Sequence, residues 1–238
     1  MSLDGITILA VVPARGGSKS IPRKNLAVIQ GHSLIAHVAA VTRALPWIDR
    51  AVLSTDDEEI AAEGLRAGLL LPFMRPAGLA GDRSASVDMW RHAWLASEEE
   101  FGMHFDVSVL LEPTSPLRRS GDVEATVKLL IDGQHAAAAT VSRTPAHYSP
   151  HKTLEIDGNG VISFYLEDGA RYSLRQSIPT YYHRNGICYA VRRETLIENR
   201  QIIEKNCAAL IIDRPVVNID EPLDLEFAAF LMAREAAK

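Results

Sequence analysis

The hydrophobic pattern alternates between short apolar runs and stretches with helical periodicity. Residues 8–14 (ILAVVPA) form a continuous apolar run, which is typical of a strand buried on both faces of a parallel sheet. After Ser33, apolar residues recur every three or four positions as far as Leu45, which predicts an amphipathic helix that ends before Pro46. The chain therefore begins with a strand, a loop and a helix.

The same alternation continues along most of the chain. Further strands are predicted at residues 50–55, 69–74, 106–111, 136–141, 187–191 and 208–212. Further helices are predicted at residues 58–67, 86–100, 121–131, 195–203 and 222–236. Strands that alternate with helices predict an α/β fold with a mostly parallel sheet and helices in layers on both sides.

The last predicted helix, at residues 222–236, begins with a proline at its first position. Leu223, Phe227, Phe230 and Leu231 lie on one face of this helix, so we expect these four side chains in the core.

The regular alternation stops at about residues 143–184, where prolines, tyrosines and histidines accumulate. Strands at 153–156 and 161–165 flank the turn at 157–160, and this arrangement predicts a β-hairpin. We interpret the segment as a small β-rich insertion in a single domain of residues 1–238. Because it is too small to form a core of its own, burial against a second subunit in a homodimer is the simplest expectation.

Composition excludes several classes of partner. The 238 residues are 47% hydrophobic and 23% charged, as in an ordinary globular protein. A net charge of −5 argues against nucleic acid as a partner. Two cysteines are too few for a disulfide framework, and no apolar run is long enough to cross a membrane. We therefore expect a soluble cytoplasmic protein without a membrane partner.

A basic, glycine-containing loop follows the first strand at residues 15–25 (RGGSKSIPRKN). Glycines at the end of a parallel strand let backbone N–H groups approach an anion, and four cations within ten residues suit a polyphosphate. The loop contains neither a Walker A motif nor a dinucleotide fingerprint. A solvated basic turn is the alternative, but the position favours a ligand because α/β sheets bind ligands at the carboxyl ends of their strands.

The stretch VPARGGSKSIPRKNL resembles the signature of the acylneuraminate cytidylyltransferases, the CMP-sialic acid synthetase family. Further matches occur in the family's order at 75–76, 79–82, 112–118, 149–152, 175–176, 185–186 and 218–220. The resemblance thus covers nearly the whole chain. It implies a fold like that of the nucleotide-diphospho-sugar transferases, with three layers around a mostly parallel sheet.

The resemblance implies a CTP site around the basic loop, with Arg15 and Lys24 as catalytic cations. The residues implied to surround the triphosphate and ribose are Arg15, Gly16, Gly17, Ser18, Lys19, Lys24 and Asn25. Arg75 and Ser86 match positions on the cytosine side. Two alternatives stay open: Arg75 as a surface charge, and Ser86 as a helix N-cap.

On the sugar side, the resemblance implies contacts from Glu112, Thr114, Ser115 and Tyr189. The family usually has glutamine at position 112, and a carboxylate there removes two donors and adds charge. A rigid turn is the alternative for residues 112–116.

Lys152 and Arg175, in the insertion, match positions that reach a neighbouring subunit's site and hold the sugar acid. Solvated charge is the alternative for both. His183 stands where the family often has arginine, so that contact is expected to be shifted or lost.

Asn218 and Asp220 match two positions where the family typically has aspartate, and they imply a Mg²⁺ site. Alternation along an extended segment points both side chains the same way. Asp220 is the expected catalytic metal carboxylate, with Asn218 as a neutral ligand. Asp224 is a weaker candidate and suits the first turn of the last helix, whereas Asp220 as a helix cap is the alternative.

The leading hypothesis is an enzyme that joins CTP to a sialic acid-type 2-keto sugar acid and releases pyrophosphate. One alternative is a related nucleotidyltransferase that uses another sugar acid, such as a 3-deoxy-octulosonate, or another nucleotide. The other is a noncatalytic nucleotide-binding sensor, which would keep the basic loop without metal chemistry.

Overall fold

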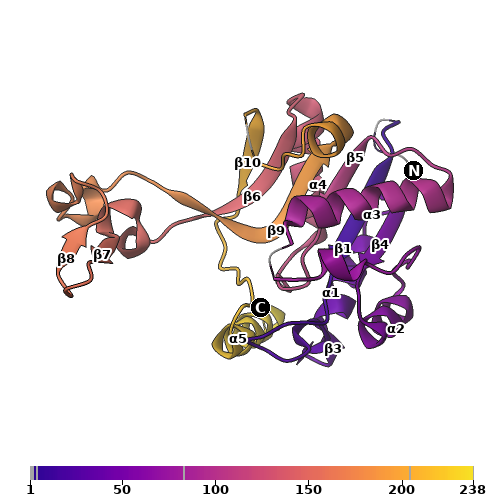
Figure 1. Ribbon diagram of the computed structural model, residues 1–238, viewed down its shortest axis with the longest axis horizontal. Helices are drawn as coiled ribbons and strands as arrows, with labels where there is room; N and C mark the ends of the chain where they lie inside the picture. Colours follow the sequence, from indigo (N-terminus) through magenta and orange to yellow (C-terminus); the bar gives the residue numbers. More distant parts are fainter. Residues whose placement is uncertain (1–2, 4, 83, 204, 238) are drawn as a thin grey trace.

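The computed structural model describes residue 3 and residues 5–82, 84–203 and 205–237. Its main sheet has six strands in the order β10-β6-β9-β5-β1-β4 (Figure 1). The strands are β1 (Ile8–Pro13), β4 (Arg50–Ser54), β5 (Val107–Leu110), β6 (Ala137–Arg143), β9 (Tyr182–Arg192) and β10 (Cys207–Ile211). Only β9 runs antiparallel to its neighbours in this sheet, so the prediction of a mostly parallel α/β fold is confirmed.

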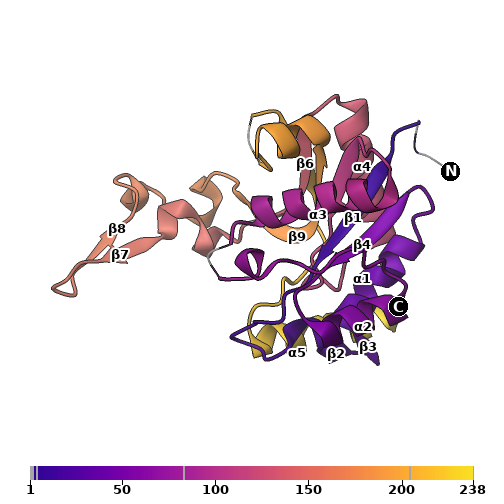
Figure 2. The same cartoon turned by 45° about the vertical axis from the view of Figure 1, so that its right-hand side comes forward.

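The apolar run of β1 is buried on both faces of the sheet. Ile8, Ala10 and Val12 pack toward the helices α1 (Leu34–Arg43), α2 (Glu58–Ala67) and α4 (Ser120–Asp132). Leu9 and Val11 pack toward α3 (Ser86–Phe101), which crosses the opposite face (Figure 2). Helices therefore cover the sheet on both sides. Within the described residues, no helix is both long and apolar enough to cross a membrane.

Side-chain caps fix where the first two helices begin. Ser33 Oγ accepts a hydrogen bond from the Ala36 N–H at the start of α1. Asp57 Oδ1 accepts bonds from the N–H groups of Glu59 and Ile60 at the start of α2. The segments that join β1 to α1 and β4 to α2 therefore lie at the edge of the sheet where the parallel strands end.

The segment between β6 and β9 projects from the body of the molecule (Figures 1 and 2), and we call residues 144–181 the arm. It contains the predicted hairpin, formed by β7 (Leu154–Ile156) and β8 (Ile162–Phe164). Asp157 Oδ1 accepts N–H bonds from Asn159 and Val161 and closes the turn. The arm also contains the short helices η3 (Ala146–Tyr148), η4 (Pro150–Lys152), η5 (Gly169–Arg171) and η6 (Arg175–Ser177).

Two predicted elements are much shorter than expected. Residues 69–74 form a single bridge, between Leu70 and Val52, because Pro72 cannot donate to a sheet ladder. The helix predicted at 195–203 is one turn, η7 (Glu194–Glu198), and it ends before Arg200, which has a φ of 55°.

The prediction for the packed face of α5 (Pro222–Ala236) is wrong for three of four residues. Leu223, Phe227 and Phe230 are 71%, 49% and 58% exposed, and only Leu231 is buried. Ala228 and Leu231 pack with a small cluster that contains Ile29, Leu34, Leu117, Val217 and Ile219. Because α5 carries apolar residues nearly all around, periodicity does not single out the buried face.

Candidate active site

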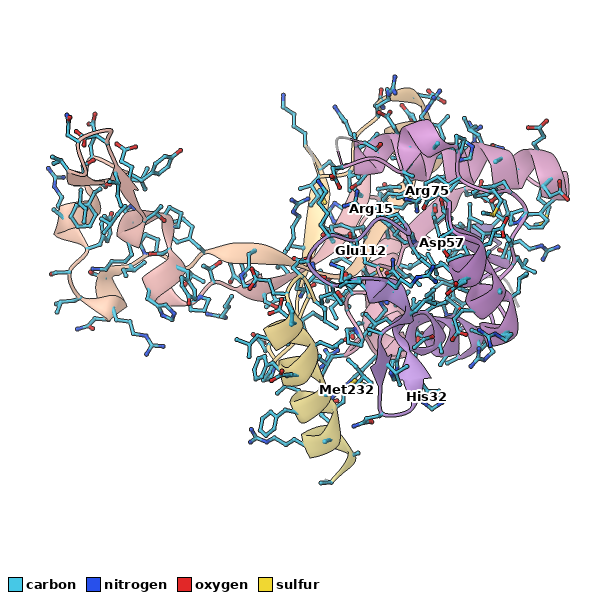
Figure 3. The ribbon with its side chains drawn as sticks, turned by 60° about the horizontal axis from the view of Figure 1, so that its bottom comes forward. Arg15, His32, Asp57, Arg75, Glu112 and Met232 are labelled. Atoms are coloured by element: carbon cyan, nitrogen blue, oxygen red, sulfur yellow. The ribbon has the colours of Figure 1, made fainter. Side chains whose placement is uncertain are left out.

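A cleft of about 330 Å³ lies at the carboxyl ends of β1 and β5. It brings together the basic loop (residues 15–25), the segment before α3, the segment after β5 and the segment before α5. The predicted site residues that line it are Arg15, Ser18, Lys24, Asn25, Arg75, Ser86, Glu112, Thr114, Asn218 and Asp220. Figure 3 shows Arg15, Arg75 and Glu112 close together in this part of the molecule.

The basic loop is held in place from inside. Asn25 is buried, and its Nδ2 donates to the Arg15 carbonyl at 3.0 Å. A Cβ on Gly16 would lie 2.8 Å from Asp57 Oδ2, so only glycine lets the loop pack on the start of α2. The Gly16 N–H donates to Asp56 Oδ1 at 3.0 Å. Gly17 has free space around its Cα.

Asp82 binds two cations of the basic loop. Its carboxylate lies 2.9 Å from Arg15 Nη1 and 2.5 Å from Lys19 Nζ, and these two cations hold the pKa of Asp82 below its usual range. Arg15 lines the cleft, whereas Lys19 is exposed beside it. Exposed ion pairs of this kind are weak, so an anionic ligand can replace Asp82 at little cost.

Lys24 connects the basic loop to the segment before α5. Its Nζ donates to the Ile219 carbonyl at 2.8 Å and to Asp220 Oδ1 at 3.1 Å. The Ile219 N–H in turn donates to the Thr114 carbonyl at 2.8 Å. The largely buried Lys24 side chain and the Ile219 N–H together therefore connect three segments of the cleft.

The Asp220 carboxylate is free to face the cleft because a neighbouring residue caps α5. Asp224 Oδ2 accepts the N–H groups of Asp220 and Glu221, both at 2.9 Å. The alternative of Asp220 as the helix cap is therefore wrong, and Asp224 is a first-turn helix residue as interpreted.

Asn218 and Asp220 supply the hard oxygen donors that Mg²⁺ prefers. Among the described residues, no group of three or more His, Cys, Asp or Glu side chains is arranged to hold a metal. The donors present therefore fit an ion that takes most of its ligands from phosphate oxygens and water.

Arg75 is buried at the back of the cleft, so the alternative of a surface charge is wrong. Its Nε donates to Ser54 Oγ at 3.0 Å, and its Nη2 donates to the Ser54 carbonyl. Burial lowers its pKa to about 10. Ser86 is the first residue of α3 and follows the N-cap Ala85, so it lines the cleft and does not cap the helix.

Arg118 fastens the loop after β5 to β9. Its buried guanidinium donates to the carbonyls of Glu112 at 2.7 Å, of Gly186 at 3.0 Å, and of Ile187. Gly186 has a φ of 71°, and a Cβ there would lie 2.7 Å from Ser115 Oγ and 2.8 Å from Glu112 Oε2. Glycine is therefore required at 186 for its backbone angle and for space.

The Glu112 carboxyl lies in a setting that disfavours its charge. Burial is the largest cause that raises its pKa, and the charge of Asp220 adds to it, although Arg118, Arg184 and Lys24 act in the opposite direction. Burial, followed by the charge of Glu112, also raises the pKa of Tyr189 to about 12.

We expect Glu112→Gln to be more stable than the parent protein at pH 7. With a folded pKa above the unfolded value, the ionised carboxylate costs stability, and this cost grows as pH rises from the unfolded pKa through the folded one. The difference should therefore disappear below about pH 4, where both states are protonated. Urea unfolding over a pH series, without nucleotide or metal, measures it. Glu99→Gln, an exposed carboxylate of α3, is the control, and a less stable Glu112→Gln at pH 7 would contradict the prediction.

Four residues expected on the sugar side do not line the cleft. Ser115 is buried, and its Oγ donates to the Asn185 carbonyl at 3.3 Å, as in a rigid turn. Tyr189 is buried in the core beneath α3. Lys152 and Arg175 line a separate pocket of about 510 Å³ in the arm. A single chain therefore does not bring these two cations to the cleft.

A second pocket, of about 770 Å³, adjoins the cleft at the base of the arm and shares Asn218 with it. His183 Nδ1 hydrogen-bonds to Thr144 Oγ1 at 3.1 Å. The next residue, Arg184, also lines this pocket, and its positive charge lowers the pKa of the Glu112 carboxyl. Arg184 thus places a cation in this pocket one position after His183.

Sequence reasoning assigned no role to Asp82, Arg118 or Arg184. Asp82 and Arg118 stand within stretches that match the family motifs, and that position was the only signal for them. Arg184 follows His183 directly, so a shift of one position was the available clue.

Comparison with known proteins identifies the family. Residues 9–205 match the family described as Cytidylyltransferase. The chain belongs to this family. The resemblance to CMP-sialic acid synthetases is therefore confirmed, and the protein is a nucleotidyltransferase.

Relatives within the family match nearly the whole chain. The chain is 32% identical to post-translational flagellin modification protein B of Campylobacter coli, over 94% of both chains. It is also 32% identical to a CMP-N,N'-diacetyllegionaminic acid synthase of Campylobacter jejuni, over 95% of both. A CMP:2-keto-3-deoxy-manno-octonic acid synthetase solved in complex with CTP has the same fold, with a TM-score of 0.71 at 21% identity over 96% of this chain and 99% of that one.

Proposed function

We propose that this protein transfers CMP from CTP to a nonulosonic acid and releases pyrophosphate. The observation that carries the proposal is the cleft itself, where Lys24 joins the basic loop to Asp220 at the carboxyl ends of β1 and β5. Relatives named CMP-N,N'-diacetyllegionaminic acid synthase and pseudaminic acid cytidylyltransferase support a sugar acid as the acceptor.

In the proposed reaction, the anomeric hydroxyl of the sugar attacks the α-phosphorus of CTP. A new oxygen–phosphorus bond forms, the bond to the β-phosphate oxygen breaks, and the hydroxyl proton is released. Arg15 and Lys24 stabilise the negative charge on the phosphate oxygens, and the neighbouring Ser18 supplies a hydroxyl donor in the same loop. The buried Arg75 and the start of α3 at Ser86 bound the cleft on the side proposed for cytosine.

We further propose Mg²⁺ as the cofactor, held by Asp220 with Asn218 as a neutral ligand. A bound Mg²⁺ supplies charge neutralisation to the triphosphate. Asp220 faces the cleft while bonded to Lys24, so the two side chains can bind cation and phosphate side by side.

The sugar acid is proposed to occupy the second pocket, next to Asn218. Arg184 lines that pocket and offers a guanidinium to a carboxylate. Lys152 and Arg175 act from the arm of a partner subunit in a homodimer, since in their own chain both line a pocket that contains no residue of the cleft.

A homodimer with shared sites predicts complementation between two inactive chains. An Arg15→Ala chain lacks the nucleotide cation, and an Arg175→Ala chain lacks the arm cation. Mixed dimers contain one site with neither substitution, so we expect them to recover up to about half of the parent activity per dimer. Activity of mixtures refolded together, with dimers verified by mass, measures this. No recovery in verified mixed dimers would contradict shared sites.

A pyrophosphate-release screen tests the reaction itself. The four nucleoside triphosphates are crossed with legionaminic, pseudaminic and neuraminic acids, a deaminated nonulosonate and a 3-deoxy-octulosonate. Turnover with CTP and a nonulosonate supports the proposal. Turnover only with the octulosonate or another triphosphate supports a related nucleotidyltransferase, and CTP binding without any release supports a sensor.

A further inference from the structure

The Glu112 side chain lines the cleft without a hydrogen-bond partner among the described residues. Three described cations act on its charge, but none of them forms an ion pair with it. Arg118 uses its guanidinium on three main-chain carbonyls, and Lys24 uses its ammonium on one carbonyl and on Asp220. The third cation, Arg184, lines the second pocket. A partly buried carboxylate without a partner costs stability, so a ligand that binds it recovers free energy.

The side chains of Glu112 and Asn218 converge on one point of the cleft. A Cβ on Gly186 would lie 2.8 Å from Glu112 Oε2 and 3.3 Å from Asn218 Cγ, so both side chains border the space that this glycine leaves empty. Asp220 lines the same cleft. Burial is the largest cause of the raised pKa of Glu112, and the negative charge of Asp220 also raises it. The two carboxylates therefore interact across the cleft.

Bound CTP adds further negative charge to this part of the cleft. In the proposed reaction Lys24 stabilises charge on phosphate oxygens, so it no longer neutralises Asp220 alone. Glu112 and Asp220 then share one cleft with a polyphosphate. Like charges at short range repel one another unless a cation binds them. Mg²⁺ is such a cation, because it binds carboxylate and phosphate oxygens together.

We propose that Glu112 is a second carboxylate ligand of the Mg²⁺ assigned to Asp220, an inference that rests on the proposed function. The chain then supplies two charged donors and the neutral amide oxygen of Asn218, while phosphate oxygens and water supply the other ligands. Glu112 thus belongs to the metal side of the cleft. Its charge is unsuited to the sugar side, because the acceptor is itself a carboxylate that an ionised glutamate repels.

Metal binding also offsets the stability that Glu112 costs the empty protein. Without nucleotide or metal, the raised pKa makes the ionised side chain unfavourable to the fold at pH 7. A cation binds the ionised form in the folded protein and stabilises it by mass action. A carboxylate that weakens the empty cleft is therefore compatible with one that strengthens the loaded cleft.

Calorimetric titration with CTP tests the assignment when no sugar acid is present, so that no transfer takes place. One series contains Mg²⁺, and the other contains EDTA. Glu112→Gln removes the charge and keeps the shape of the side chain. We expect this variant to bind metal-free CTP at least as tightly as the parent, because a repulsion is lost. With Mg²⁺ present, it should bind CTP about 10-fold more weakly, because a metal ligand is lost.

A Glu112 carboxylate that only repels the nucleotide gives a different pair of constants. Glu112→Gln would then bind CTP more tightly in both series, and this outcome would overturn the proposal. An unchanged Kd in the Mg²⁺ series would overturn it as well. Glu99→Gln, at an exposed position of α3, is the matched control and should keep both constants of the parent protein.

A second variant restores the carboxylate from the other side of Gly186. In Glu112→Gln combined with Asn218→Asp, the charge returns to the space that both side chains border. We expect the double variant to recover most of the Mg²⁺-dependent affinity that Glu112→Gln loses. No recovery in a double variant with a parent-like circular dichroism spectrum would contradict a metal position shared by residues 112 and 218.

These measurements separate this proposal from the proposed function. If the parent releases pyrophosphate with CTP and a nonulosonate while Glu112→Gln keeps the parent affinity for CTP with Mg²⁺, only the Glu112 assignment fails. If the parent neither binds CTP nor releases pyrophosphate, the proposed function itself fails.

Discussion

Replacing Lys24 by alanine is expected to lower kcat/KM by two or more orders of magnitude and to leave the fold intact. Lys24 Nζ lies 3.1 Å from Asp220 Oδ1 in the cleft, and in the proposed reaction it stabilises charge on the transferred phosphate. Loss of one such preorganised group costs about 3 kcal/mol in the transition state, which is more than 100-fold in rate. Arg15→Ala should act in the same direction. Initial rates of pyrophosphate release, with the sugar acid varied at saturating CTP, measure kcat/KM. Circular dichroism measures whether the fold is intact.

Arg23→Ala is the matched control for this prediction. Arg23 belongs to the same basic loop, but its guanidinium pairs with Glu59 of α2 and it does not line the cleft. We expect it to keep parent-like kcat/KM. If Lys24→Ala and Arg15→Ala also kept near-normal kcat/KM, the loop would have no part in catalysis.

Asp220→Asn is expected to abolish Mg²⁺-dependent turnover with little change in thermal stability. The variant removes the charged donor of the proposed metal site. The Asp220 side chain is mostly exposed, and Lys24 keeps its hydrogen bond to the Ile219 carbonyl, so little stability is lost. Asn218→Asp has the opposite charge effect, because it adds a carboxylate next to Asp220. It should lower the Mg²⁺ concentration needed for half-maximal rate. A Mg²⁺ titration of initial rates and a thermal melt test both variants.

Asp224→Asn separates metal binding from helix capping. Asp224 accepts the N–H groups of Asp220 and Glu221, so its substitution should lower the melting temperature. The Mg²⁺ dependence should stay close to that of the parent protein. An active Asp220→Asn enzyme with unchanged Mg²⁺ dependence would refute the metal assignment and favour the binding-protein alternative.

Local sequence signals were sufficient for the elements that build the cleft. The run at residues 8–14 predicts a strand buried on both faces, and β1 is buried in this way because helices cover both sides of the sheet. The position of the basic loop directly after that strand predicts a ligand site, and Arg15 and Lys24 line the cleft. These inferences depend on neighbours in sequence, which periodicity and loop chemistry describe well.

Contacts between distant segments were beyond the same signals. Arg118 donates hydrogen bonds to the carbonyls of Glu112 and Gly186, two residues that are far apart in the sequence. Arginine is usually a surface residue, so the sequence does not predict that Arg75 is buried. Its hydrogen bond to Ser54 holds it in the wall of the cleft. In α5, apolar residues occur nearly all around the helix, so periodicity does not identify the buried face. Three residues that were expected in the core are therefore exposed.

β9 runs against its neighbours, and this direction has an evolutionary consequence. Because β9 is antiparallel to β5 and β6, both ends of the arm leave the sheet at the edge where β1 and β5 end. Exchanging residues 144–181 as a unit would therefore change the part of the second pocket that Thr144, Pro145 and Tyr148 line, without altering a strand of the main sheet or the basic loop. Selection on the second pocket and selection on the folded core can thus act on separate stretches of one gene.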